Sequence, residues 1–284
     1  MQRLYPILFV FLWSTGFIGA KYGLPYAEPL SFLLVRYGFV IGLMLLIALA
    51  TRAPWPDDPR QWLHIGVSGI LVHAVYLGGV FVAIKHGLPA GVTALVVGMQ
   101  PLLTALGAGW LLGEQVAGRQ WGGLALGFVG VGLVVSGKFG DVALGPMLIP
   151  ALVALLGITA GTLYQKRFCA RFDLRTGSVI QFVPTAIVTA IAIALFEDFR
   201  IEWTGDFIFA LGWLVLVLSL GAISLLNLLI RSGSAVNVAS LFYLTPLSTA
   251  LIAWAIFGEK LTLTATVGMA LAVSGVYLVA RPAK

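Results

Sequence analysis

Ten long apolar runs, separated by short linkers, dominate this sequence of 284 residues. An α-helix needs about 20 apolar residues to cross the hydrocarbon core of a membrane. The runs lie near residues 4–22, 29–50, 62–84, 88–113, 119–136, 144–166, 176–196, 206–230, 234–257 and 263–280. Charged residues make up 10% of the chain, against about 25% in a soluble globular domain. The sequence therefore predicts an all-α membrane protein with ten transmembrane helices.

The polar residues exclude several classes of protein. The net charge is +6, but the 17 Lys and Arg residues stand singly among apolar runs, so nucleic acid is not an expected partner. Cys169 is the one cysteine, which rules out an intrachain disulfide and a thiolate metal cluster. His64, His73 and His86 share no metal-ligand spacing, and neither GxxxxGK[ST] nor HExxH occurs. We expect no catalytic residue, no cofactor, no metal and no ATP hydrolysis.

The Lys and Arg residues between the runs predict the orientation, because cytoplasmic loops carry an excess of them. With a cytoplasmic N-terminus, the inner side holds Arg3, Arg52, Arg60, Arg119, Lys166, Arg167, Arg171, Arg175, Arg231, Arg281 and Lys284, and the outer side Lys21, Lys85, Lys138, Arg200 and Lys260. Eleven against five predicts that both termini are cytoplasmic. The acidic loop from Glu197 to Asp206 then faces outward.

The sequence also repeats itself at one fixed offset. Pro101 and Pro246 stand 145 residues apart, and so do the Gly-Glu pairs that begin at Gly113 and Gly258. The same offset, without a gap, pairs Gly16 with Gly161, Lys21 with Lys166, Arg36 with Gln181, Gly123 with Gly268 and Gly130 with Gly275. The chain therefore consists of two related halves, roughly 1–140 and 146–284.

Each half contains five runs, and five is an odd number, so the second half must cross the membrane in the opposite sense to the first. We therefore expect two inverted five-helix repeats around a central cavity. Inverted repeats are the recurring architecture of secondary transporters, because two similar halves exchange conformations around a central site. The repeat also indicates that the first apolar run belongs to the fold and is not a cleaved signal peptide.

Three features resemble a known family. They are the opening stretch LWSTGFIGAKYGLPYAEP, the prolines within the fourth and ninth runs, and the Gly-Glu endings of those two runs. Together they are similar to the ten-helix EamA-type branch of the drug/metabolite transporter superfamily, and most similar to its bacterial exporters of amino acids, aromatic ones included, and of other metabolites. The resemblance implies a basket of helices one to four and six to nine around the cavity, with helices five and ten outside it.

Polar side chains within lipid spans usually face protein or water, so they identify candidate substrate contacts. His73 and Tyr76 are three residues apart in the third run, a spacing that places them on one face of an α-helix. The remaining candidates near mid-membrane are Trp13, Ser14, Ser240 and Tyr243. Two interpretations stay open: an aromatic-walled pocket with a few orienting hydrogen bonds, or ordinary packing between helices.

Arg36 is the one Arg or Lys that lies well within an expected span. A charge at the bilayer centre costs at least about 2.5 kcal/mol on insertion scales. Its side chain would either reach the outer surface or form a structural pair, or it would bind the carboxylate of a substrate. Gln181 is its partner in the repeat.

Two prolines and two glycines are candidate moving parts. Pro101 and Pro246 each remove a backbone hydrogen bond near mid-membrane, which marks either a hinge beside the site or a simple packing kink. Gly113 and Gly258 end the same two helices on opposite sides of the membrane. We assign these four residues to gating.

These observations predict a secondary transporter of the bacterial inner membrane that exports small amphipathic metabolites, with amino acids, aromatic ones included, as the first substrates. Its expected partners are a small-molecule substrate and the lipid bilayer, and no oligomer is required. The alternatives are an efflux carrier for drugs or organic cations, and a channel or scaffold. The first run holds no carboxylate, so proton-coupled and facilitated transport both remain open.

Overall fold

The chain folds into helices whose bounds follow the apolar runs. The computed structural model describes residues 4–88, 90–136, 146, 148–169, 171–257 and 262–280, and Gly258 lies outside these residues. Within them the regular structure is helical, apart from one isolated bridge between Ala27 and Ile201. The elements are α1 (Tyr5–Gly23), η2 (Leu24–Tyr26), α2 (Pro29–Ala50), α3 (Pro59–Gly69), η3 (Ile70–Leu77), α4 (Gly78–Lys85), α5 (Ala90–Val97), α6 (Gln100–Leu112), α7 (Gly118–Ser136), α8 (Leu148–Phe168), α9 (Leu174–Phe196), α10 (Gly205–Trp213), η4 (Leu214–Ala222), α11 (Ile223–Ser232), α12 (Ala235–Ser240), η5 (Leu241–Tyr243), α13 (Leu244–Phe257) and α14 (Leu263–Ala280).

Eight helical runs among the described residues are long and apolar enough to cross a membrane. An all-helical membrane protein is therefore confirmed. The ten expected spans would add α1, in which Tyr5–Gly16 is an apolar stretch shorter than a span, and α7. The hydropathy of α7 is lowered by Arg119, by Gln120 and by its glycines.

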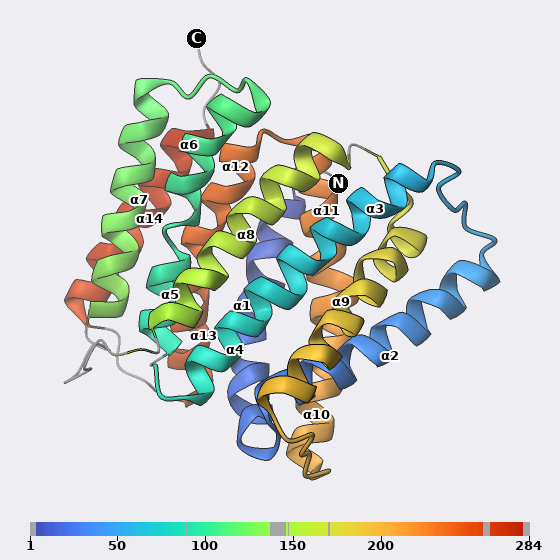
Figure 1. Ribbon diagram of the computed structural model, residues 1–284. Helices are drawn as coiled ribbons and strands as arrows, with labels where there is room; N and C mark the ends of the chain where they lie inside the picture. Colours follow the sequence, from blue (N-terminus) through green and yellow to red (C-terminus); the bar gives the residue numbers. More distant parts are fainter. Residues whose placement is uncertain are drawn as a thin grey trace.

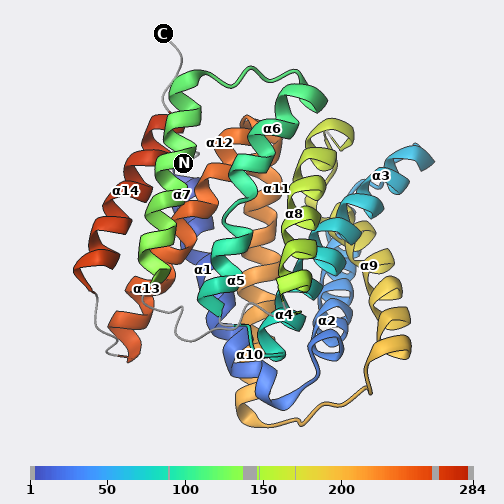
Figure 2. The same cartoon turned by 60° about the vertical axis from the view of Figure 1, so that its left-hand side comes forward.

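The bundle has α7 and α14 together at one side and α2 and α9 together toward the other, with α1, α8 and α11 between (Figures 1 and 2). Glycines bring α7 and α14 into backbone contact. A Cβ atom added at Gly123 would lie 2.7 Å from the oxygen of Gly275, and one added at Gly130 would lie 2.6 Å from the oxygen of Gly268. Such close approach requires residues without side chains.

Helices three and eight of the expected set are each interrupted by a π-helical segment. These segments, η3 and η4, end at Leu77 and Ala222, which are 145 residues apart. π-Helical turns inside longer helices are rare and often mark functional sites. Helices four and nine are interrupted as well: Gly98 and Met99 separate α5 from α6, and the 3-10 turn η5 separates α12 from α13.

We expect Gly130→Ala to destabilise the protein, because the new Cβ would lie 2.5 Å from the backbone nitrogen of Ala272. Overpacking of this kind costs about 1–3 kcal/mol. The matched control is Gly132→Ala on the same helix, where a Cβ meets nothing within 4 Å. Thermal unfolding in detergent should give a lower melting temperature for Gly130→Ala alone. Equal melting temperatures for both variants would contradict the backbone contact.

Candidate functional site

A small cavity lies at the centre of the bundle, where α1, α2, η3 and α4 meet η4 from the second half of the sequence. It is lined by Trp13, Gly16, Ala20, Arg36, Tyr76, Leu77, Val80, Phe81, Leu214 and Leu218. Its volume is about 30 Å³, roughly the room of one water molecule. Sites for small molecules measure about 300–1,000 Å³. The side chains therefore leave much less room here than a small-molecule site needs.

Arg36 on α2 is the charged residue of the cavity, and its side chain is 0% exposed. Its Nε donates a hydrogen bond to Ser219 Oγ on η4, at 3.0 Å. Nη1 and Nη2 have no hydrogen-bond partner among the described residues. The side chain therefore does not reach the outer surface. A buried charge is costly unless it is paired, so this arrangement favours an anion in the cavity.

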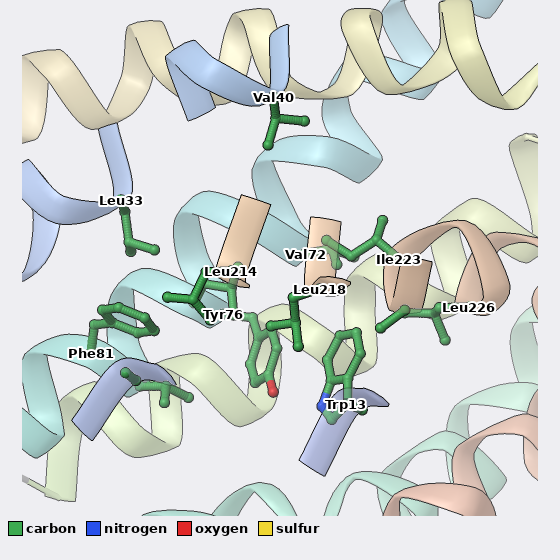
Figure 3. Close-up of a cluster of buried hydrophobic side chains, with 14 of the residues drawn as sticks. Trp13, Leu33, Val40, Val72, Tyr76, Phe81, Leu214, Leu218, Ile223 and Leu226 are labelled. Carbon is green, nitrogen blue, oxygen red and sulfur yellow. The ribbon is translucent and has the colours of Figure 1, made fainter. Parts of the chain in front are cut away.

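Two aromatic rings from different helices form one wall of the cavity. Trp13 on α1 and Tyr76 on η3 are stacked, with ring centroids 6.3 Å apart and planes inclined by 10°. Figure 3 shows the two rings next to each other, close to Leu218. Phe242 meets Trp13 edge-on at 5.3 Å. The structure thus brings together three of the residues that the sequence singled out: Trp13, Tyr76 and Arg36.

His73 is buried like Tyr76, at 1% exposure, but it faces a different neighbour. Its ring stacks on Phe182 of α9 with centroids 4.3 Å apart, and its two nitrogens have no partner among the described residues. It is not among the residues that line the cavity. The reason is η3: a π-helical turn holds more residues than an α-helical turn, so residues three apart no longer share a face.

The other three candidates lie outside the cavity. Ser14 Oγ donates to the carbonyls of Val10 and Thr245, at 2.6 and 3.2 Å, and so ties α1 to α13. Ser240 Oγ donates to Asn237 within its own helix. Tyr243 is fully buried in a separate apolar cluster with residues of α7 and α14, and a Cβ atom added at Gly127 would lie 2.5 Å from its ring.

The candidate gating residues mark ends and breaks of helices. Pro101 is the second residue of α6 and Pro246 the third of α13, so each follows an interruption directly. Gly113 ends α6 with a φ of 68°, a conformation that suits glycine. The carboxylate of the next residue, Glu114, accepts hydrogen bonds at 3.0 and 3.1 Å from the backbone N–H of Ala235, at the start of α12.

The structure contains a second cluster of buried polar side chains, which was not predicted from the sequence as one cluster. Gln165 Nε2 donates to Asn227 Oδ1 at 2.8 Å, Gln181 Nε2 donates to Ser68 Oγ at 3.2 Å, and all four side chains are buried. They come from α8, α11, α9 and α3, and we call them the amide cluster. The signal that pointed here was the repeat, since Gln181 stands where the first half has Arg36.

Comparisons with known proteins identify the family of the chain. The model of the EamA-like transporter family matches residues 3–136 and 145–281. An uncharacterized transporter of Bacillus subtilis, YvbV, is 29% identical over 272 residues, which cover 95% of this chain and 88% of that one. A probable amino-acid metabolite efflux pump of Escherichia coli is 24% identical over 287 residues, covering 96% and 92%.

A solved crystal structure has the same fold, with a TM-score of 0.80 over 98% of this chain and 96% of the other, at 22% identity. The family matches cover most of the sequence, and both relatives named above are transporters. The chain therefore belongs to the EamA-like transporter family, as the sequence predicted, and is a multi-pass membrane transporter rather than an enzyme.

Proposed function

We propose that this protein is a secondary transporter of a bacterial inner membrane that exports small amphipathic metabolites by alternating access. Amino acids, aromatic ones included, are the first substrates to test, since one relative is a probable amino-acid metabolite efflux pump. One observation carries the proposal: the cavity combines the rings of Trp13 and Tyr76 with the guanidinium of Arg36, whose Nη1 and Nη2 have no partner among the described residues. Such a site suits a molecule with a charged end and an apolar body.

The proposal includes two inverted five-helix repeats, about 1–140 and 146–284. Gly123 and Gly130 are the repeat partners of Gly268 and Gly275, yet the contacts join Gly123 to Gly275 and Gly130 to Gly268. Exchange of partners in this way is the signature of a two-fold axis between equivalent elements. The π-helical segments at equivalent positions of the two halves support the same duplication, as do the separate family matches to each half.

Arg36 and its repeat partner behave alike. Arg36 donates to Ser219 on helix eight of the proposed set, and Gln181 donates to Ser68 on helix three, so each joins the second helix of one repeat to the third helix of the other. A movement of one repeat relative to the other would therefore change the surroundings of Arg36 and of Gln181 together.

Alternating access requires the closed cavity to open toward one side at a time. The interruptions before Pro101 and Pro246 are the proposed hinges. Backbone breaks within the membrane are tolerated where protein or a cavity satisfies the freed backbone groups. The bond from Ala235 to Glu114 joins helix four to helix nine on the proposed cytoplasmic side, and Gly113 gives the turn that places Glu114 there. Opening toward the cytoplasm would break this contact.

An efflux carrier for organic cations fits less well. A cation in this cavity would lie beside the buried charge of Arg36, and like charges repel strongly where water is excluded. The aromatic wall alone would suit a lipophilic drug. The guanidinium of Arg36 is therefore what favours a metabolite exporter over a drug or cation carrier.

We expect Arg36→Met to abolish or strongly reduce transport without loss of stability. Losing charge-assisted hydrogen bonds to a carboxylate removes about 1.5–3 kcal/mol of binding, which is roughly a ten- to hundred-fold loss of affinity. Removal of an unpaired buried charge should leave the melting temperature unchanged or raised. The measurements are counterflow in proteoliposomes and thermal unfolding in detergent.

The matched control is Arg200→Met, which removes an arginine whose side chain is 76% exposed; both properties should stay as in the unmodified protein. A structural role for Arg36 would instead give a variant that unfolds at lower temperature, and normal transport by Arg36→Met would refute the proposed site.

The proposed topology places both termini in the cytoplasm. We expect Asp198→Cys, in the predicted outer loop, to react with a membrane-impermeant maleimide on intact cells, and Asp57→Cys to react only after permeabilisation. Both positions are exposed. Burial raises the pKa of the native Cys169 thiol to about 11, so at pH 7 it stays protonated and the unmodified chain serves as the unlabelled control. The opposite labelling pattern would invert the topology.

A further inference from the structure

We propose that the cavity selects organic monocarboxylates with an apolar body, and that a free amino group on the substrate weakens binding. This inference rests on the proposed function and narrows its substrate class. It follows from which polar atoms of the cavity are already engaged and which are free.

The free part of Arg36 has the shape of a carboxylate site. Nε is held by Ser219, and Ser219 Oγ in turn donates to the carbonyl of Leu214 at 3.1 Å. The guanidinium is therefore fixed in place, and Nη1 and Nη2 remain at its end without partners among the described residues. Two parallel N–H groups in a rigid fork match the two oxygens of a carboxylate, which makes such pairs strong and specific.

An ammonium group finds no comparable partner. Among the described residues no Asp or Glu lines the cavity. Apart from Arg36, the polar side-chain groups of this lining are the Tyr76 hydroxyl and the Trp13 indole N–H, of which the indole only donates. Aromatic faces attract cations, but the Trp13 ring is already packed against Tyr76, with centroids 6.3 Å apart, and against Phe242, at 5.3 Å. An ammonium would thus be left beside a guanidinium with one hydroxyl oxygen to accept from it.

The net charge of the site with its ligand also favours monocarboxylates. The volume of about 30 Å³ shows how little water the closed site holds, and uncompensated charge is expensive under such conditions. Arg36 with a monocarboxylate has no net charge. With a zwitterionic amino acid the site keeps one positive charge, and with an organic amine it holds two. The amide cluster, the counterpart in the second repeat, is neutral and cannot compensate.

Three probes that share a phenyl ring test the inference. 3-Phenylpropanoate carries only the carboxylate, L-phenylalanine adds the amino group, and 2-phenylethylamine carries only the amine. We would measure their binding to the purified full-length protein by calorimetry at pH 7.5, and counterflow of radiolabelled 3-phenylpropanoate and L-phenylalanine in proteoliposomes against protein-free liposomes. 3-Phenylpropanoate should bind at least tenfold more tightly than L-phenylalanine, and 2-phenylethylamine should not bind.

Arg36→Met should remove the preference between the first two probes, and Arg200→Met should keep it. If L-phenylalanine binds as tightly as 3-phenylpropanoate or more tightly, the inference is overturned while the proposed transporter stands. Selective binding of 2-phenylethylamine would overturn it in favour of the cation carrier. If none of the three binds or is transported, both the inference and the proposed function for aromatic amphipathic metabolites fail.

Discussion

The absence of water in the hydrocarbon core governs this structure, since every polar group placed there must find its partner within the protein. Helices satisfy most backbone groups, and serine and threonine side chains at the crossings bond to nearby carbonyls, as Ser14 does to Val10 and Thr245. The amide cluster satisfies itself through mutual bonds among Gln165, Asn227, Gln181 and Ser68. Within the cavity, the outer nitrogens of Arg36 are the exception.

The two proposed repeats differ at the position where this constraint matters most. Arg36 and Gln181 are equivalent by the offset of 145, and both are buried on the second helix of their repeat. Gln181 is surrounded by amides that complete its hydrogen bonds, whereas the wall around Arg36 is aromatic and aliphatic. The two proposed repeats therefore hold a neutral, hydrogen-bonded cluster at one of the equivalent positions and an incomplete, cationic site at the other.

Much of this arrangement could be predicted from the sequence. The apolar runs indicated the helices, because these depend on composition and spacing alone, and three short motifs carried the family resemblance. Trp13, Tyr76 and Arg36 were among the candidates from the sequence, and the structure places all three at one cavity. Whether each candidate reached the cavity depended on local geometry. His73, in η3, stacks on Phe182, and Tyr243, the last residue of η5, packs against Gly127 of α7. The amide cluster needs four helices to meet, which no linear pattern encodes.

On the proposed function, the unpaired guanidinium also links substrate binding to closure. Closing the helices around an empty cavity removes water from Arg36 without supplying a counter-charge, and that desolvation is unfavourable. A carboxylate neutralises the site and bonds to Nη1 and Nη2, so it lowers the free energy of the closed form more than that of an open, hydrated one. A ligand shifts a conformational equilibrium only through such a difference in affinity. The same residue that selects the substrate would therefore favour closure around it, and the neutral amide cluster would leave the opposite repeat free of that dependence.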